Sequence, residues 1–329
     1  MVSSLIASRT AITRLAIQRS TLPALLSQTC VPNQIPMMKQ FPAMSGGPAA
    51  TSSFVDKHPD FKKIEQDRPE FNTELHPANV TKSPNPNWEW GSGVKRPNDA
   101  PHIDIDPYAE GRPWMDNYRL LVSGIVPRPI GLLSTRSGDD KTENLSPMSY
   151  FQVVDHDPAT FVVGFSSRPD RPKDTWRNLL ESGECVINIV SEDMVEAVMA
   201  TSVDAPYGVS EWDVSGLTRG DTKTVKPARV KESVFSIEGK LVDSHEFGHH
   251  TKPGFSVASL AIIEAKWFWI RSDALDESKK NIDLNVLKPV AQLGGIAYGR
   301  VTETFERPRK TWAEAVKEAP WLADLPGAK

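Results

Sequence analysis

The chain has 329 residues, 39 % hydrophobic and 24 % charged, so it can bury a substantial core in one large domain or two small ones. A formal net charge of -4 leaves no basic surplus for a nucleic-acid backbone, and we expect no nucleic-acid partner. The best candidate for a membrane span, 255–270, is broken by Glu264 and Lys266. We therefore expect a soluble protein with no membrane partner.

The N-terminal segment 1–55 contains no Asp or Glu, while Arg9, Arg14, Arg19 and Lys39 supply positive charge among serines and short aliphatic residues. This composition is typical of a mitochondrial transit peptide, which predicts a mitochondrial matrix protein. The alternative is a disordered extension without an address, in a cytoplasmic protein. The two cysteines are too few for a disulfide framework, which fits a reducing compartment.

Segment 56–113 is rich in proline and lacks helical or alternating periodicity, so we expect no regular structure there. Its aromatic residues, among them Phe71, Trp88 and Trp90, exceed what a free linker needs. One interpretation is an extended arm laid over the globular domain or over a second subunit. The other is a flexible tether with incidental aromatic residues.

The folded domain is predicted to span 114–310, followed by a C-terminal helix and tail over 311–329. Short apolar or alternating runs separated by turn residues predict a mainly β domain with a few helices, arranged as an antiparallel barrel or sandwich. The predicted strands are 119–122, 130–135, 160–166, 185–190, 232–242, 257–270 and 297–305.

Helices are predicted at three places. The first is capped by Asp174 or Thr175, carries Trp176, Leu179 and Leu180 on one face and stops at Gly183. The second follows Ser191 and presents Met194, Val195, Val198 and Met199 at helical spacing. The third has a capping box formed by Thr311 and Glu314 and ends at Pro320.

No dinucleotide fingerprint, phosphate-binding loop, nucleophile elbow or zinc-protease motif is present in the sequence. The histidines of segment 245–250 (HEFGHH) admit a metal cluster, but consecutive histidines beside a glycine are more typical of a solvated turn. We therefore assign no metal and no catalytic nucleophile.

The most informative stretch is 126–175, where strand-like runs alternate with polar loops. Pro127 and Pro129 hold the backbone extended and so display Arg128 on a stiff segment. The run 130–135 predicts a strand that ends in hydroxyl side chains. This stretch therefore begins with groups that can meet a polar ligand.

Beyond a predicted hairpin turn at 137–140, segment 144–151 mixes amide, hydroxyl, Met and aromatic groups, which together suit a flat heteroaromatic ring. Arg168, Arg171 and Lys173 then lead into a helix start, and helix N-terminal amides with basic side chains make a good phosphate site. Taken singly, each of these pieces is more typical of a solvated loop.

Taken together and in order, the pieces resemble the flavin reductase-like family, FMN-binding proteins of the split-barrel superfamily. The similarity runs roughly from Tyr118 to Pro308 and does not cover the N-terminal third. It is carried by 126–130 (VPRPI), Ser134 and Thr135, 144–151 (NLSPMSYF), 173–175 with Asn178, 187–190 (INIV), and 289–295 (PVAQLGG) with Tyr298.

The resemblance implies a six-stranded antiparallel Greek-key barrel of the FMN-binding split-barrel type. It also implies a homodimer with FMN near the subunit interface and NADH or NADPH as electron donor. Hydride passes between the two cofactor rings in such proteins, so no catalytic side chain is expected. Met148 departs from the family, which often has Phe at this position.

Carried over to this sequence, the resemblance implies that Ser134, Thr135, Lys173 and Thr175 lie near the phosphate and ribityl chain, with Arg168 as a second phosphate partner. Asn144, Ser146 and Ser149 lie along the isoalloxazine. The complete predicted cofactor-binding set is Arg128, Pro129, Ser134, Thr135, Asn144, Leu145, Ser146, Pro147, Met148, Ser149, Tyr150, Phe151, Ser166, Arg168, Lys173, Asp174 and Thr175.

Three functions agree with this sequence. The first is an FMN-dependent oxidoreductase that takes hydride from NADH or NADPH. The second is a non-catalytic FMN carrier or electron-transfer protein, suggested by the missing dinucleotide fingerprint. The third is a split-barrel binding module without flavin.

Overall fold

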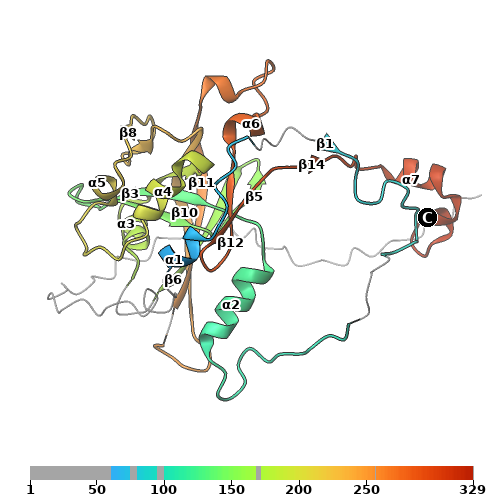
Figure 1. Cartoon of the computed structure of the whole chain (residues 1–329), viewed down its shortest axis with the longest axis horizontal. Coiled ribbons are helices and arrows are strands. Elements are labelled where there is room, and N and C mark those ends of the chain that lie inside the picture. Colours follow the sequence, from blue (N-terminus) through green and yellow to red (C-terminus); the bar gives the residue numbers. More distant parts are fainter. Residues whose placement is uncertain (1–60, 75–79, 95–99, 168–171, 256, 329) are drawn as a thin grey trace, which may run out of the picture. The chain divides into compact units, whose positions relative to one another are not determined.

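The computed structural model describes residues 61–74, 80–94, 100–167, 172–255 and 257–328 (Figure 1). The predicted targeting segment 1–55 and the predicted phosphate partner Arg168 lie outside the described residues. Within them, no helix has the length and apolar character needed to cross a membrane.

Seven antiparallel strands form the main sheet, in the order β4-β3-β7-β10-β11-β6-β5 (Figure 1). The prediction of a mainly β protein with a few helices is confirmed, and the main sheet has seven strands where the resemblance implied six. The strands are β3 (Gly131–Arg136), β4 (Glu143–Met148), β5 (Phe151–His156), β6 (Ala159–Ser167), β7 (Glu184–Ile189), β10 (Phe235–Gly248) and β11 (Val257–Ile270).

Both faces of β3 are buried, because side chains alternate across the sheet and each face has its own core. Leu133 joins a cluster with Val163 and Ile187, which the helix α3 (Asp174–Ser182) closes with Trp176. The neighbouring Leu132 points to the other face and joins a second cluster containing Trp212. Residues next to each other on β3 therefore belong to different environments.

The longest hairpin, β10–β11, carries a register irregularity between Glu238 and Gly239. A Cβ on Gly239 would lie 2.5 Å from Cγ2 of Ile263, so only glycine fits this close approach. The buried carboxylate of Glu238 accepts hydrogen bonds from the backbone of Lys223 (2.8 Å) and from Nε1 of Trp269 (2.6 Å). This carboxylate ties the loop before β9 (Arg229–Val230) to the hairpin.

Helix α3 (Asp174–Ser182) forms where the first helix was predicted. Trp176 and Leu179 are buried, and Gly183 ends the helix in the left-handed conformation with φ 69°. The N-cap is Lys173 rather than Asp174 or Thr175, and it makes no side-chain capping bond. The predicted cap was wrong because the helix begins one residue earlier than expected, so Asp174 and Thr175 are its first two helical residues.

The second predicted helix is a 3₁₀ turn, η2 (Glu192–Met194), followed by α4 (Val195–Ala200). Met194 and Val198 are buried as predicted, while Met199 is exposed. The helix α5 (Glu211–Ser215) contributes Trp212 to the second core. Further short elements are β8 (Arg219–Gly220), η3 (Ser272–Ala274) and α6 (Leu284–Leu287).

The predicted strand 119–122 is wrong, because these residues belong to the helix α2 (Trp114–Gly124). A four-residue apolar run does not distinguish a strand from one face of a helix, and here Pro113 stands at the N-cap position. Only Val122 of this helix is buried. The run 297–305 likewise divides into β13 (Ala297–Arg300) and β14 (Thr304–Phe305).

A small second sheet joins the predicted entrance of the site to a late segment. Its strand order is β13-β12-β2, where β2 is Arg128–Pro129 and β12 is Val290–Gly294. Gln292 pairs with both Arg128 and Tyr298. Residues from the two ends of the domain thus lie beside each other.

The proline-rich segment contains a short helix, α1 (Phe61–Gln66), and the strand β1 (Val80–Thr81), so the expectation of no regular structure was wrong at these places. β1 pairs in parallel with β14. Arg300 donates to the carbonyl of Asn72 (2.8 Å) and lies over the ring of Phe71 (4.3 Å). The predicted capping box of Thr311 and Glu314 is confirmed at the start of α7 (Trp312–Glu318), which precedes η4 (Pro320–Asp324).

Candidate functional site

Two side-chain hydrogen bonds join the end of the β3–β4 hairpin to the first turns of α3. Nδ2 of Asn144 donates to the hydroxyl of Thr175 (2.8 Å), and Nδ2 of Asn178 donates to that of Thr135 (3.3 Å). All four side chains are buried. We call this group of four residues the polar clasp. It places hydroxyl and amide groups beside the N-terminus of a helix, where the helix dipole favours a negative charge.

The polar clasp retains acceptor capacity for a ligand. Within the described residues, Oδ1 of Asn178 is buried without a hydrogen-bond partner, and so is the hydroxyl of Ser167 on β6. Buried polar atoms are normally paired, so these two oxygens have the capacity to bond a ligand or a water molecule. These atoms suit hydroxyl groups of a polyol.

Ser134 does not belong to the polar clasp. Its cross-strand partner is Leu145, whereas Thr135 pairs with Asn144, and neighbouring pairs of an antiparallel ladder face opposite sides. Ser134 is buried, and its hydroxyl has no partner within the described residues. Strand alternation therefore puts the side chains of Ser134 and Thr135 on opposite faces of the sheet.

On the side of Ser134, a buried carboxylate holds the backbone of the edge strand. Oε2 of Glu211 accepts a hydrogen bond from the backbone N–H of Leu145 (3.1 Å). Burial raises the pKa of Glu211, although the bond from Leu145 acts in the opposite direction. Because β4 is the edge strand, the N–H of Leu145 has no partner strand on this side, and Glu211 serves as its hydrogen-bond acceptor instead.

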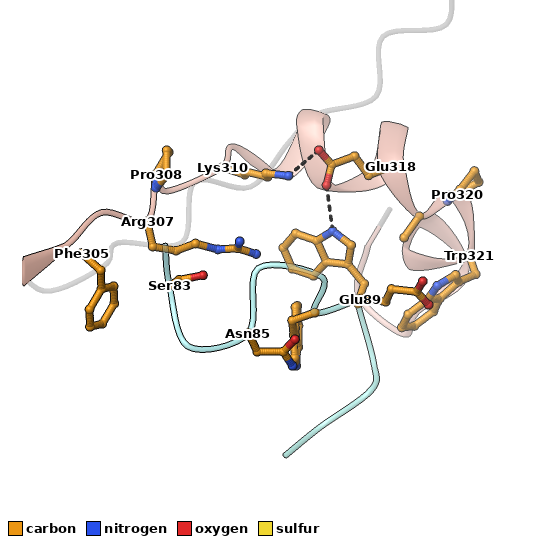
Figure 2. A pocket seen from close by; sticks show the side chains of 13 residues that line it. Ser83, Asn85, Glu89, Phe305, Arg307, Pro308, Lys310, Glu318, Pro320 and Trp321 are labelled. Carbon is orange, nitrogen blue, oxygen red and sulfur yellow. Dashed lines mark hydrogen bonds and ion pairs between the residues drawn. The ribbon is translucent and has the colours of Figure 1, made fainter. Parts of the chain in front are cut away.

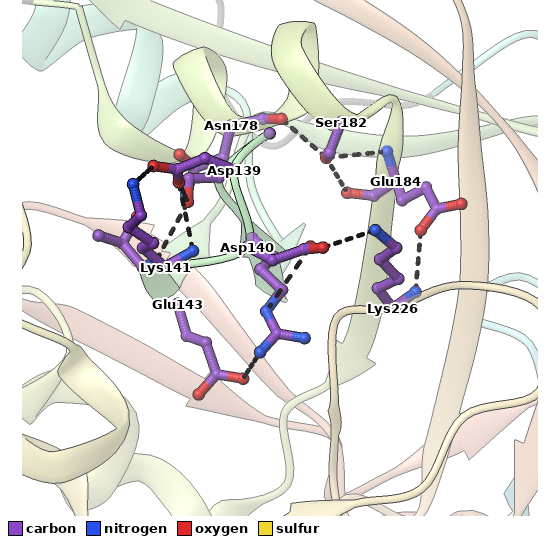
Figure 3. A network of polar contacts seen from close by, with 12 residues as sticks. Asp139, Asp140, Lys141, Glu143, Asn178, Ser182, Glu184 and Lys226 are labelled. Carbon is purple, nitrogen blue, oxygen red and sulfur yellow. Dashed lines mark hydrogen bonds and ion pairs between the residues drawn. The ribbon is translucent and has the colours of Figure 1, made fainter.

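Salt bridges and hydrogen bonds fix the hairpin that carries the polar clasp (Figure 3). Nζ of Lys226 donates to Asp140 (2.6 Å), and its backbone N–H donates to Glu184 (2.8 Å). Ser137 and Lys141 hydrogen-bond the carboxylate of Asp139 and lower its pKa to about 2. The turn at 137–140 thus forms as predicted and is anchored to β7.

At the other end of β4 lies a small pocket of about 160 Å³. Pro147 and Ser149 contribute to it from the predicted segment, and Gln292 and Tyr298 from the small sheet. The hydroxyl of Tyr298 donates to the sulfur of Met199 (2.7 Å). Because a cavity of about 150 Å³ holds one benzene ring, this pocket accommodates a single ring and not three fused ones.

Successive β4 residues rise by about 3.3 Å each, so Asn144 and Pro147 are roughly 10 Å apart along the strand. Ser146 shares the face of Asn144, and Pro147 the face of Leu145. Pro147 is tolerated because β4 is the edge strand of the sheet. The edge of β4 therefore links the polar clasp to the single-ring pocket.

Several predicted residues serve the fold instead. Arg128 is buried and not displayed, because its Nη1 donates to the carbonyls of Val122 and Ile125 at the end of α2 (both 2.6 Å). Met148 and Phe151 are buried in the first core cluster, and Leu145 in the second. These three side chains contribute to core packing.

The remaining predicted residues are accessible. Tyr150, Ser166, Pro129 and Lys173 are exposed, whereas Asp174 is half-buried. Lys173 is the N-cap residue of α3 and stands beside the first turn of that helix.

Two residues of the site were absent from the predicted set. Asn178 follows Thr175 by three positions, which places both on one helix face, and this spacing was a usable signal. Glu211 offered none, because its burial arises from packing against a strand 66 residues earlier.

The histidine segment forms local contacts. His245 pairs with Asp243 (3.1 Å), and Nδ1 of His249 accepts the backbone N–H of Lys252 (3.1 Å). Across the described ranges, no three His, Cys, Asp or Glu side chains come together as metal ligands.

The fold and the site define a split-barrel protein of the flavin-related oxidoreductase class. A family model described as "Flavin reductase like domain" matches residues 123–282. An uncharacterized protein of Halalkalibacterium halodurans is 34 % identical over 197 residues, which are 60 % of this chain and 92 % of that protein. The chain belongs to the flavin reductase-like family.

Solved structures agree with this assignment. Nitrilotriacetate monooxygenase component B from Bacillus cereus is 27 % identical with a TM-score of 0.58, over 64 % of this chain and all 100 % of that one. A split-barrel protein of Shewanella frigidimarina, assigned as a flavin reductase, has a TM-score of 0.52 at 22 % identity, over 61 % and 95 % of the two chains. The second likeness concerns the fold alone.

Proposed function

We propose that this protein binds FMN and transfers a hydride from NADH or NADPH to it. The observation that carries the proposal is the polar clasp, with its unpartnered buried oxygen of Asn178, next to the N-terminus of α3. When bound, the flavin supplies the hydride-accepting ring. Membership of the flavin reductase-like family supports this choice of cofactor.

The residues present fit such a group. Thr175 and the first amides of α3, with the exposed Lys173, hold a phosphate, and Asn178 accepts a ribityl hydroxyl. The outer edge of β4 presents carbonyl groups, because Glu211 occupies the N–H of Leu145 and Pro147 has no N–H. The pocket of Pro147 and Tyr298 excludes water from one ring at the end of this edge.

The absorption spectrum of the purified full chain tests the proposal, recorded before and after NADH or NADPH is added without oxygen. We expect a yellow protein whose visible bands bleach within seconds. A yellow protein that neither nucleotide bleaches, with any acceptor, contradicts hydride transfer.

A flavin carrier is the second candidate, because no pyrophosphate-binding loop is found in the sequence. Stopped-flow reduction separates the two. Reduction faster than turnover supports the oxidoreductase, whereas reduction only by a protein partner supports the carrier.

We also propose a homodimer. Large apolar side chains are exposed at the C-terminal end of α2 and on β5, including Leu121, Ile125 and Val154. Such side chains are typical of a protein–protein contact when they are contiguous. Light scattering of the wild type and of Leu121→Glu tests this, and a monomeric wild type at micromolar concentration contradicts it.

The mitochondrial address remains a proposal that rests on the composition of segment 1–55. Fusing this segment to a fluorescent protein tests it, with Arg9, Arg14 and Arg19 changed to Glu as the control. Diffuse fluorescence of the unaltered fusion contradicts the address.

A further inference from the structure

A larger pocket, of about 750 Å³, lies where the proline-rich arm meets the C-terminal segment (Figure 2). Both segments are outside the matched family domain of residues 123–282. The volume falls within the range of small-molecule sites. The side chains that matter here are Trp88, Glu89, Trp90, Arg307 and Trp321.

Specific contacts hold the walls of this pocket. Nε1 of Trp90 donates to Glu318 (3.1 Å), which also accepts a short hydrogen bond from Lys310 (Figure 2). Nε1 of Trp88 donates to the carbonyl of Gly93 (2.8 Å). These bonds use the polar edges of both indoles and do not cover the ring faces, although the edge of one ring lies against the face of the other.

The arm also packs closely against the third indole. Gly91 has φ +84°, and a Cβ there would lie 3.2 Å from Cζ2 of Trp321. A residue with a side chain would be strained at this torsion and would press on the ring. The glycine thus allows the arm to approach Trp321.

The charges around the indoles comprise a direct ion pair and two side chains outside it. The pair is Lys310 with Glu318. Within the described residues the side chains of Arg307 and Glu89 make no direct hydrogen bond or ion pair, although the charge of Arg307 also helps to lower the pKa of Glu318. In Figure 2 the guanidinium of Arg307 points from one wall toward the indoles, and Glu89 lies beside Trp321 on the other side. The pocket therefore offers a cation at one end, a carboxylate at the other and aromatic surfaces between them.

The aromatic surfaces are accessible to a ligand. Trp88 and Trp90 meet edge to face with ring centroids 5.7 Å apart, and each is 36 % exposed. Trp321 is 47 % exposed. Exposed, fixed indoles are stacking partners for flat rings. A benzene ring needs about 150 Å³, so this volume has room for two or three fused rings.

We propose that this pocket binds a planar aromatic compound of two or three fused rings, with an anionic group that pairs with Arg307 and an amino group that pairs with Glu89. The site is separate from the flavin site and does not depend on it. The anionic group of the ligand pairs with the guanidinium of Arg307, and its rings stack on the indoles. The carboxylate of Glu89 fixes the orientation of the ligand by accepting from its amino group.

The probe for this site is 6-amino-2-naphthoate, titrated into the full-length protein with FMN equimolar to the protein, so that little free FMN competes for the pocket. Its fluorescence anisotropy reports binding. We expect saturable binding that Arg307→Gln and Glu89→Gln each weaken by about tenfold, since each removes a charge-assisted contact. The matched controls are Arg309→Gln and Glu306→Gln, which change neighbouring exposed residues that do not line the pocket. They should leave the affinity unchanged.

A second ligand separates the two ends. The compound 2-naphthoate lacks the amino group. Its affinity should therefore be lower in Arg307→Gln than in the wild type and the same in Glu89→Gln as in the wild type. Three results overturn the proposal: no saturable binding of the amino compound, equal losses in the control variants, or equal sensitivity of both ligands to Glu89→Gln. All four variants change exposed side chains, and an unchanged thermal midpoint confirms that each is folded.

Discussion

The side-chain amide of Asn144 donates to the hydroxyl of Thr175 across 2.8 Å, and both side chains are buried. The bond joins the edge strand β4 to the first turn of α3, although the two residues are 31 positions apart. It therefore sets the place of the helix N-terminus relative to the strand edge. In the proposed function, that relationship aligns the phosphate end of the cofactor with its ring end.

Thr175→Val tests this alignment because it keeps the side-chain volume and removes the hydroxyl. Asn144 then loses its buried acceptor, and we expect the free energy of unfolding to fall by about 1 to 3 kcal/mol. FMN affinity should fall as well. Urea denaturation and FMN titration measure the two effects. Thr201→Val is the control, because its hydroxyl bonds only the carbonyl of Val198 within its own turn. Equal FMN affinity in Thr175→Val and wild type would contradict the role of the polar clasp.

Lys173→Ala should weaken FMN binding by about 1 to 3 kcal/mol if the lysine holds the phosphate, since charge-assisted bonds are worth that much. The stability of the free protein should hardly change, because Lys173 is exposed and makes no capping bond. Leu179→Ala is the converse control. Its fully buried side chain predicts a loss of about 2 to 5 kcal/mol in unfolding free energy, with FMN affinity kept in the folded fraction. An unaltered affinity in Lys173→Ala would move the phosphate elsewhere.

Glu238 makes folding depend on pH. Burial acts to raise its pKa, but the hydrogen bonds from Thr224, Trp269 and Lys223 outweigh burial and leave the pKa lowered. Because the folded pKa lies below the unfolded value of about 4.3, the stabilisation is complete above that pH and is lost as the pH falls through the folded pKa. Glu238→Gln removes this dependence. Urea denaturation between pH 3 and 7 should show the difference between wild type and variant shrinking as the pH falls, and a constant difference would contradict it.

The thiol of Cys185 should not react with thiol reagents while the protein is folded. Burial, and to a smaller extent Glu184, raise the pKa of its thiol to about 12. At pH 8 roughly one molecule in ten thousand then carries the reactive thiolate. Labelling with an aromatic disulfide reagent checks this in a Cys30→Ser background, where Cys185 is the remaining cysteine. We expect labelling only in urea. Rapid labelling of the folded chain would show that the site opens locally.

The sequence predicted the strands best where apolar runs were long and bounded by turn residues. The run 257–270 coincides with β11, and the helix with Trp176 and Leu179 ends at Gly183 as expected. It failed at 119–122, where four residues carry no distinguishable period. It also missed β4, because Asn144, Ser146 and Pro147 lower the strand propensity of an edge strand.

For the site, the sequence predicted the segments better than the directions of their side chains. Ser134 and Thr135 are adjacent, so a shared role was reasonable, but strand alternation sends them to opposite faces. Arg128 lies in the predicted segment, yet the carbonyls at the end of α2 take its guanidinium. These carbonyls are available to Arg128 only because α2 forms, and the sequence did not predict α2.

The pairing of β1 with β14 closes a loop of great length, since Thr81 and Thr304 are 223 positions apart. The entropy cost of loop closure grows with the logarithm of the loop length. A ladder of two residue pairs stabilises the closed loop by little compared with that cost. This contact should therefore form late in folding and open first under hydrogen exchange, before the main sheet loses protection. The pocket lined by Trp88, Trp90 and Trp321 would then assemble and disassemble as a unit of low local stability, so a ligand bound there would hold the proline-rich arm against the C-terminal segment.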